Sequence, residues 1–281
     1  MMNIKYKLAA VLLGLGLGFG LGSSPAIAGR GGSAAQIQSA VRSGSVDAII
    51  AEVERAEALM CAECVQIVTN LTEHPSYEVR KVAAWWFAKR PGLKKMLVPE
   101  FVSDLSSTNS VRVRNAADFL GGSKTFTALP ALRAAIHQNV SAEAKLAMVR
   151  AIQYMAHPSG NPVLTTAMGD GDPSVRAAAV TAWRDIRGQV DGAPAVALLG
   201  DADANVRAQA AAVVGAMAAQ AGRAALEAIV VNDADPVVRR NAAWALGKLG
   251  QAASRAALTR ASNDTSGLVR MTARASLSAL R

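Results

Sequence analysis

A segment of about 31 residues recurs along most of this sequence. The stretches DPSVRAAAVTAWRDI, DANVRAQAAAVVGAM, DPVVRRNAAWALGKL and SGLVRMTARASLSAL each place a basic residue, which we call the anchor, after an apolar one. The anchors are spaced by 34, 31, 31, 31, 32 and 31 residues and are Arg80, Arg114, Lys145, Arg176, Arg207, Arg239 and Arg270. A fixed period of this size is typical of stacked repeats, in which each unit buries its apolar face only against its neighbours.

Each anchor is expected to lie in the first turn of a helix. Ser and Asp accept hydrogen bonds from the free N–H groups of a first turn, and one of them stands four residues before every anchor: Ser76, Ser110, Ser141, Asp172, Asp203, Asp235 and Ser266. Apolar residues at offsets −1, +3, +6/+7 and +10 from the anchor form one stripe of such a helix. A shorter apolar segment precedes each cap, so the repeat is predicted to be helix–turn–helix and the fold all-α.

These features resemble the HEAT-repeat family, in its short bacterial form known as PBS-lyase HEAT-like repeats. The resemblance covers roughly residues 57–281 and is strongest in the Asp-x-Asp-x-x-Val-Arg runs, which begin at Asp170, Asp201 and Asp233. It implies a right-handed α-solenoid, an alpha-alpha superhelix, of about seven helix pairs that serves as an interaction scaffold. It also implies that the anchor arginines are structural and bond Asp carboxylates of the inter-helix turns; with Asp172, Asp203 and Asp235 they are the repeat anchors.

The first 28 residues have the pattern of a cleaved signal peptide. Lys5 and Lys7 precede an apolar run over residues 8–22, and Ala26-Ile27-Ala28 supplies small residues before Gly29. A transmembrane anchor is the competing interpretation, but the run is shorter than the roughly 20 residues that span a bilayer. We therefore expect cleavage after Ala28 and a periplasmic or secreted protein with no transmembrane segment.

Three parts are predicted after the cleavage site. Residues 29–44 are expected to be a flexible Gly/Ser-rich linker, and residues 45–281 a HEAT-like solenoid that begins with a capping helix at Ser45. Residues 90–107, which contain the spacing of 34, depart most from the repeat and are expected to bulge.

The positive charge of the chain does not by itself indicate a nucleic-acid partner. The formal net charge is +9, but an exported protein does not meet the chromosome. The expected partner is a protein with an acidic or extended surface; binding of anionic cell-envelope components is an alternative.

No catalytic constellation is recognised, and no cofactor or metal is expected. His74, His137 and His157 lie in or beside inter-helix connections, and the His-Glu pairs of the HEAT-like iron hydroxylases are absent. The lyase activity of phycobilin lyases is not carried over, because those enzymes act in the cytosol.

Cys61 and Cys64 are the only cysteines. A haem attachment motif would need His where Val65 stands, and a zinc site would need two more ligands. In an oxidising compartment a local structural disulfide is favoured, since residues three apart on a helix have Cα atoms about 5 Å apart. Buried free thiols and an accessory redox function remain open.

The concave face of the predicted solenoid is the expected binding surface. Offset +5 from the anchor lies opposite the packed stripe, and offsets +1 and +9 flank it. Together they give the predicted partner-binding residues Lys81, Trp85, Lys89, Phe119, Arg150, Arg240, Trp244 and Lys248. Aromatic and basic side chains of this kind anchor protein interfaces, but Trp85 and Trp244 could instead pack between repeats. Trp86 and Trp183, on the packed stripe, are expected in the core.

Overall fold

The computed structural model describes residues 32–138 and 140–280, and every regular element in these ranges is a helix. The chain divides into two compact units, one ending at Ala131 and the other beginning at Leu132. The predicted signal peptide lies outside the described residues. Among the helices of the described ranges, none combines the length and apolarity needed to cross a membrane.

The first unit consists of three helix pairs, in which each pair packs against the next. Its α-helices are α2 (Ala34–Ser43), α3 (Val46–Arg55), α4 (Ala62–Leu71), α5 (Tyr77–Ala88), α6 (Pro91–Asp104) and α7 (Ser110–Gly122), followed by the short 3-10 helix η1 (Phe126–Ala128).

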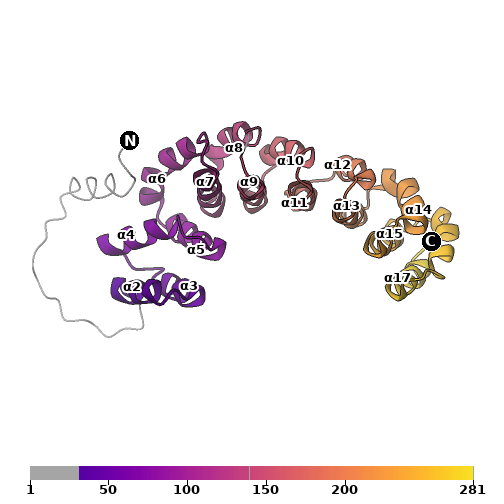
Figure 1. Cartoon of the computed structure of the whole chain (residues 1–281), viewed down its shortest axis with the longest axis horizontal. Helices are drawn as coiled ribbons and strands as arrows, with labels where there is room; N and C mark the ends of the chain where they lie inside the picture. Colours follow the sequence, from indigo (N-terminus) through magenta and orange to yellow (C-terminus); the bar gives the residue numbers. More distant parts are fainter. Residues whose placement is uncertain (1–31, 139, 281) are drawn as a thin grey trace, which may run out of the picture. The chain divides into compact units, whose positions relative to one another are not determined.

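The second unit forms two layers of helices (Figure 1). The second helices of the repeats lie side by side in one layer: α9 (Ala142–Met155), α11 (Pro173–Arg184), α13 (Ala204–Ala216), α15 (Pro236–Leu249) and α17 (Gly267–Ser278). The first helices form the other: α8 (Leu129–Ala135, which begins before the unit boundary), α10 (Asn161–Met168), α12 (Ala193–Ala197), α14 (Arg223–Asn232) and α16 (Arg255–Ala261). Four 3-10 turns lead into or extend first helices: η2 (Pro158–Gly160), η3 (Leu198–Gly200), η4 (Gln220–Gly222) and η5 (Ala252–Ser254).

This arrangement confirms the predicted α-solenoid of stacked helix–turn–helix repeats. Six of the seven anchors are the fourth residue of a second helix and Arg114 is the fifth residue of its helix, and Trp86 and Trp183 are buried as predicted. The side chains of Ser141, Asp172, Asp203 and Asp235 cap their helices.

The predicted cap Ser110 is wrong by one residue. Asn109 is the N-cap of α7, and its Oδ1 accepts hydrogen bonds from the backbone N–H groups of Val111 and Arg112. Ser110 is therefore the first helical residue. The neighbouring Asn competes successfully because its carboxamide oxygen is as good an acceptor at this position as a hydroxyl.

The predicted linker over residues 29–44 is wrong for its second half. Residues 34–43 form α2, which begins at Ser33, where the Oγ accepts from the N–H of Gln36 at 3.2 Å. Ile37 and Ala40 are buried, and α2 packs on α3 and α4. The predicted capping helix is present as α3 with Ser45 as its N-cap. The repeat stack thus begins with a helix pair, because the apolar spacing of Ile37 and Ala40 gives α2 a side to bury.

The predicted bulge over residues 90–107 is also absent. Residues 91–104 form the continuous helix α6, which starts at Pro91 and contains Pro99. With 14 residues it is longer than the 8-residue α10. The extra residues of the 34-residue spacing are therefore absorbed by a longer first helix.

In three repeats, close packing between second helices depends on a glycine at offset +8 from the anchor. A Cβ on Gly215 would lie 2.7 Å from Ala245 Cα, and one on Gly247 would lie 2.5 Å from Ser276 Oγ. Gly122, at the same offset in the first unit, would meet Ala84 at 2.8 Å. Without a side chain at this position, neighbouring second helices approach almost backbone to backbone.

Candidate functional site: the arginine ladder and the second-helix face

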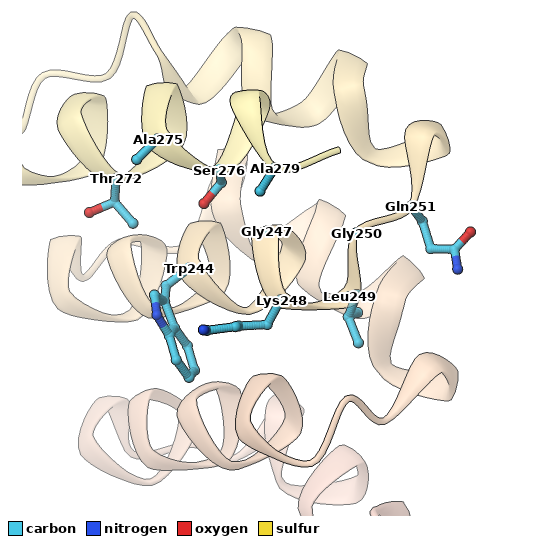
Figure 2. A pocket seen from close by; sticks show the side chains of 10 residues that line it. All are labelled: Trp244, Gly247, Lys248, Leu249, Gly250, Gln251, Thr272, Ala275, Ser276 and Ala279. Atoms are coloured by element: carbon cyan, nitrogen blue, oxygen red, sulfur yellow. The ribbon is translucent and has the colours of Figure 1, made fainter. Parts of the chain in front are cut away.

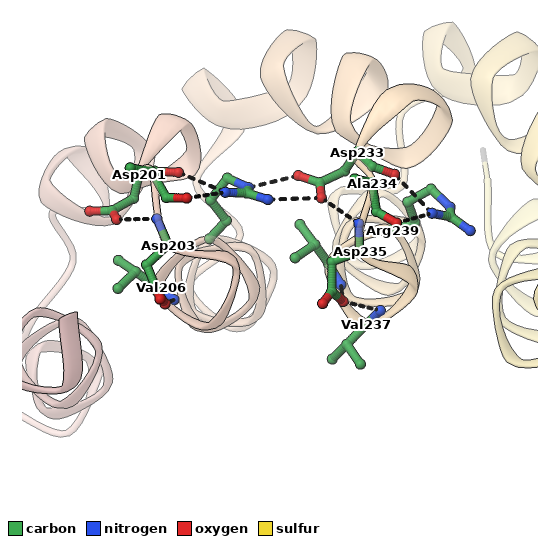
Figure 3. A network of polar contacts seen from close by, with 11 residues as sticks. Asp201, Asp203, Val206, Asp233, Ala234, Asp235, Val237 and Arg239 are labelled. Carbon is green, nitrogen blue, oxygen red and sulfur yellow. Dashed lines mark hydrogen bonds and ion pairs between the residues drawn. The ribbon is translucent and has the colours of Figure 1, made fainter.

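The anchor arginines of the second unit connect consecutive repeats (Figure 3). Arg207 donates from Nε and Nη2 to the two carboxylate oxygens of Asp233, at 2.7 and 3.0 Å, and from Nη1 to the carbonyls of Asp201 and Ala202. Arg176 holds Asp201 and Arg239 holds Asp264 in the same way. This confirms the bonding to inter-helix Asp that the family resemblance implied.

The two aspartates of each Asp-x-Asp motif have different roles. The first accepts the arginine of the preceding repeat and the N–H of the second, as Asp233 does from Asp235 at 2.9 Å. The second caps the helix that follows, as Asp235 does toward the N–H groups of Val237 and Val238. Fixed charge pairs of this kind stabilise the turn and set the distance between neighbouring repeats.

We call this series of contacts, from Arg176 to Asp201, Arg207 to Asp233 and Arg239 to Asp264, the arginine ladder. The contacts lower the pKa values of the three aspartates. Hydrogen bonds from Arg176 hold the pKa of Asp201 below its ordinary value, and bonds from Arg239 do the same for Asp264, although partial burial opposes both shifts. At Asp233 burial is the largest effect and acts to raise the pKa, but the bonds from Arg207 and from the Asp235 N–H outweigh it. The ladder aspartates are therefore ionised at neutral pH.

The earlier anchors depart from this pattern in different ways. Lys145 contacts the equivalent aspartate, Asp170, but through a single bond, from Nζ to one carboxylate oxygen at 2.6 Å. Arg80, which is buried, bonds Asp118 of α7 at 2.8 and 3.0 Å, while Arg114 bonds the neighbouring Asn115. The repeat at Lys145 therefore keeps the aspartate acceptor and changes the basic residue, whereas Arg80 keeps the arginine and bonds an aspartate within a helix.

The second helices of the second unit form a surface that we call the second-helix face. Its larger hollow, of about 770 Å³, lies between α15 and α17 (Figure 2). Trp244, Lys248 and Gln251 line one side, and Thr272, Ala275 and Ala279 line the other. Lys248 Nζ lies 5.5 Å from the centre of the Trp244 ring, within the range of a cation–π contact.

Trp244 both packs between repeats and lines the second-helix face. Its ring packs against α13 at Gly215, where an added Cβ would lie 2.7 Å from Trp244 Cζ3. The side chain nevertheless remains 37% exposed and lines the hollow. The absence of a side chain at Gly215 leaves room for the indole against α13, while another part of Trp244 faces solvent.

A second hollow on this face, of about 460 Å³, lies along α9, α11 and α13. It is lined by Arg150 and Thr181, both at offset +5, together with Gln153, Asn205 and Gln209. Arg240 lies half-buried on α15, where its Nε and Nη2 bond Asn241 Oδ1. The second unit thus places Arg150, Arg240, Trp244 and Lys248 on or beside the layer that the sequence indicated.

In the first unit the predicted basic residues are paired with acids. Lys81 lies 3.5 Å from Glu78, and Lys89 lies 2.9 Å from Glu57 and 5.5 Å from the centre of the Trp85 ring. Trp85 is half-buried on α5. These acids reduce the positive potential that the basic residues would present, so this unit is the weaker match to the predicted surface.

Phe119 was predicted on the binding face, and this prediction is wrong. The side chain is 1% exposed. Its ring stacks on Phe101 with centroids 4.0 Å apart and meets Phe87 edge-on at 5.8 Å. The long helix α6 supplies Phe101, and a fixed offset taken from the regular repeats could not reveal this extra aromatic partner.

Cys61 and Cys64 lie at the start of α4. Their sulfurs are within bonding distance, and their Cα atoms are 5.1 Å apart. Cys61 is the N-cap rather than a helical residue, and its Sγ accepts from the N–H of Cys64 at 3.0 Å. Cys64 is buried, whereas Cys61 is half-buried.

The loop before these cysteines is held by Arg90. This buried side chain donates to the carbonyls of Ala56, Glu57 and Leu59, and its guanidinium lies 3.3 Å from the centre of the Trp86 ring. Burial lowers the pKa of Arg90, and Glu57 counteracts part of that shift. Sequence reasoning missed this contact because Arg90 falls between two repeats.

The histidines have local structural contacts. His74 Nδ1 accepts from the N–H of Ser76, and His157 Nδ1 accepts from the N–H of Ser159. Within residues 32–138 and 140–280, no three His, Cys, Asp or Glu side chains are grouped in a way that could hold a metal ion.

Comparison with known proteins gives one family and several similar structures. The family described as HEAT repeats matches residues 129–199 and 192–278. No curated protein matches the sequence. The structure of the Escherichia coli protein YibA is similar, with 13% sequence identity and a TM-score of 0.53. The match covers 99% of this chain and 98% of the YibA chain.

Two further structures contain similar chains. Kap95p, solved with RanGDP, has 16% sequence identity and a TM-score of 0.54. The match covers 87% of this chain and 40% of the Kap95p chain. The CpcE–CpcF complex of phycocyanin lyase from Nostoc is 18% identical, over 93% of this chain and 100% of that one, with a TM-score of only 0.37. At these identities the likeness to YibA and Kap95p shows the fold alone.

Proposed function

Because the chain belongs to the HEAT-repeat family, with repeats matched over residues 129–278, we propose that it is an exported, non-enzymatic scaffold that binds a partner protein on its second-helix face. HEAT-repeat solenoids commonly serve as protein-interaction scaffolds. The observation that carries the proposal is the hollow between α15 and α17, where Trp244 is partly exposed beside Lys248.

The chemistry of this hollow suits a protein ligand better than a small one. It is open and lined by small residues, with a single aromatic ring and one ammonium group. Small-molecule sites are usually more enclosed and have several convergent polar groups. An exposed Trp next to a basic side chain is typical of the residues that dominate protein interfaces.

Export is part of the proposal and rests on the sequence pattern of residues 1–28. The mature chain should begin at Gly29 and be found in the periplasm or the medium. Mass spectrometry of the protein recovered from cell fractions tests this. A cytosolic product that retains residues 1–28 would contradict it.

The binding proposal is tested by photo-crosslinking in living cells. A photoreactive phenylalanine analogue replaces Thr181 or Ala275, which line the two hollows, and in a control chain it replaces Thr165, an exposed residue of first helix α10. We expect one partner to be crosslinked from the two second-helix positions and not from Thr165. Equal labelling from all three positions would contradict a specific face.

The affinity of the purified partner is then measured against two variants. Lys248→Glu changes an exposed residue and should weaken binding without changing Tm. Trp244→Ala should weaken binding and also lower Tm, because the ring packs on Gly215. Unchanged affinity in both variants would place the binding site elsewhere.

The cysteine pair supports a second candidate, an accessory thiol–disulfide function. Half-buried Cys61 is the N-cap of α4 and buried Cys64 lies behind it. A thiolate of a substrate would attack Cys61 Sγ and break the bond to Cys64, which would leave as a thiolate; attack by Cys64 on the mixed disulfide would reverse the step. Helix N-termini stabilise the thiolates that such exchange requires. Failure of the oxidised protein to exchange with a dithiol such as reduced glutaredoxin would exclude this function.

A further inference from the structure

Arg270 differs from the preceding anchors in that no carboxylate of the described residues bonds it. Arg270 Nη1 donates to the carbonyls of Asp264 and Thr265 at 2.7 and 2.9 Å. Arg207 and Arg239 make the same two bonds to their own turns. Among the described residues, however, no acceptor bonds Nε or Nη2 of Arg270, the two groups that hold an aspartate in the preceding repeats.

The guanidinium of Arg270 is therefore already oriented for a carboxylate. Its two bonds to backbone carbonyls fix the side chain as they do in Arg207, and the remaining pair of N–H groups has the parallel geometry that binds both oxygens of a carboxylate. A group that is oriented before binding loses less entropy when its ligand arrives. Arg270 thus has the same backbone contacts as Arg207 and Arg239, but no carboxylate of the described residues bonds it.

The residues around Arg270 extend the positive charge. Position +4 from the anchor is a buried apolar residue in the repeats of α11, α13 and α15, as Val180, Ala211 and Ala243, but here it is the exposed Arg274. Arg255 and Arg260 of the adjoining helix α16 are also exposed.

The distribution of charge along the sequence makes this end distinctive. Residues 236–281 contain eight basic residues and a single acidic one, Asp264. Residues 29–235 contain 20 basic and 20 acidic residues. Once residues 1–28 are set aside, all of the net positive charge therefore belongs to residues 236–281.

Exposed apolar side chains accompany the charge. On α17, Leu268 and Met271 are 59% and 66% exposed, and Val237 of α15 is 48% exposed. A ligand that carries carboxylates alone would leave these side chains in water, whereas a peptide can offer apolar side chains beside its acidic ones. The combination favours an acidic protein segment over a simple anion.

We propose that the end of the stack formed by α16 and α17 binds an acidic segment of the partner protein, with an Asp or Glu carboxylate held by Nε and Nη2 of Arg270 as Asp233 is held by Arg207. This inference rests on the proposed scaffold function and names the chemistry of the partner. The segment lies against Arg270 as the turn that contains Asp233 lies against Arg207, and its apolar residues cover Leu268 and Met271.

The carboxylate site is tested with a probe taken from the chain itself. A synthetic peptide with the sequence of residues 230–238, VVNDADPVV, contains the aspartate that Arg207 binds. Its titration into the ¹⁵N-labelled protein is followed through the Nε–Hε signals of the arginine side chains, with the Arg270 signal identified by its loss in Arg270→Lys. We expect a saturable shift of the Arg270 signal and no shift of Arg207, whose acceptor is already in place.

Two controls decide between a specific site and general attraction to positive charge. A peptide with Asn in place of both aspartates should leave the Arg270 signal unmoved. Arg270→Lys keeps the charge but loses the paired N–H groups and should weaken binding at least fivefold, whereas Arg255→Lys on α16 should not change it. Equal weakening by the two variants, or no shift of Arg270, would overturn the proposal.

An anionic membrane surface is distinguished by co-sedimentation with phosphatidylglycerol vesicles. Arg270-dependent sedimentation without a peptide shift would replace the proposal by lipid binding.

The scaffold function and the role of Arg270 can fail independently. If crosslinking at Thr181 or Ala275 captures a partner whose affinity Arg270→Lys leaves unchanged, the scaffold function stands and the role of Arg270 fails. If no partner is captured but the peptide shifts Arg270, the scaffold function fails while the carboxylate site remains.

Discussion

Arg207 and Asp233 lie 26 residues apart in the sequence and are joined by two hydrogen bonds of 2.7 and 3.0 Å, which bind one repeat to the next. The side chain of Asp233 is only 6% exposed. We expect Asp233→Asn to lower the free energy of unfolding by about 2 kcal/mol, since the carboxamide is uncharged and its single oxygen can accept only one of the two bonds. Urea denaturation measures the loss, and Asp47→Asn, at an exposed residue of α3, should show a clearly smaller one.

The ladder also predicts how stability depends on acid. The pKa values of Asp201, Asp233 and Asp264 are below the ordinary value when folded, and the unfolded value is about 3.9. Their contribution is therefore fully present above the unfolded pKa and is lost as pH falls through the folded pKa values. Tm should be nearly constant from pH 7 to about 5 and fall below about pH 4. In the triple Asn variant the acid-dependent fall should be smaller; an unchanged fall would assign it to other carboxyls.

The same conservative substitution should have different effects at two equivalent anchors. Arg239→Lys removes the paired bonds to Asp264 and is expected to cost about 1–2 kcal/mol. Arg270→Lys removes no carboxylate contact and affects only the bonds to the carbonyls of Asp264 and Thr265, which Arg239 also makes to its own turn, so it should cost clearly less than Arg239→Lys. Thermal and urea unfolding of both variants provide the comparison. Equal losses would mean that Arg270 supports the fold rather than a ligand.

Gly215 should not tolerate a methyl group. An added Cβ would lie 2.7 Å from both Ala245 Cα and Trp244 Cζ3, so α13 and α15 would have to separate. Gly215→Ala is expected to destabilise the protein by about 1–3 kcal/mol and to change the fluorescence of Trp244. Gly200→Ala, where nothing lies within 4 Å of the added Cβ, is the matched control and should leave Tm within about 2 °C.

The cysteine pair should be oxidised in the exported protein. Thiol titration of protein purified without reductant should find no free thiol, and reduction should release two. Because the bond would close only a very short loop, its loss should cost about 2 kcal/mol or less. Two reactive thiols in the untreated protein would contradict the disulfide.

The sequence could predict the regular part of this fold because each repeat contains its own signals. The anchor and the apolar stripe identify every second helix, and the predicted cap makes its side-chain bond at Ser141, Asp172, Asp203 and Asp235, whereas Ser76 and Ser266 are N-caps without such a bond. The first unit was harder to predict because Phe119 and Asp118 acquire partners from helices outside the regular pattern, Phe101 of α6 and Arg80 of α5. The linker was mistaken for a flexible segment because its Gly-rich start concealed the apolar pair Ile37 and Ala40 that α2 buries.

The special character of Arg270 was only partly visible in the sequence. Its motif matches the other anchors, so pattern alone made it structural. A signal was available at offset +4, where Arg274 stands in place of the apolar residue found in α11, α13 and α15. Whether a side chain bonds Nε and Nη2 of Arg270 depends on tertiary contacts, which a linear motif does not contain.

The uneven charge of the second unit has a consequence for how the protein meets its partner. Residues 132–235 contain eight basic and ten acidic residues, whereas residues 236–281 contain eight and one. The unit is therefore an electric dipole, and the field of an acidic molecule exerts a torque on it before any atoms touch. Approach with the Arg270 end leading becomes the preferred orientation, which shortens the rotational search and makes the association rate fall as ionic strength rises.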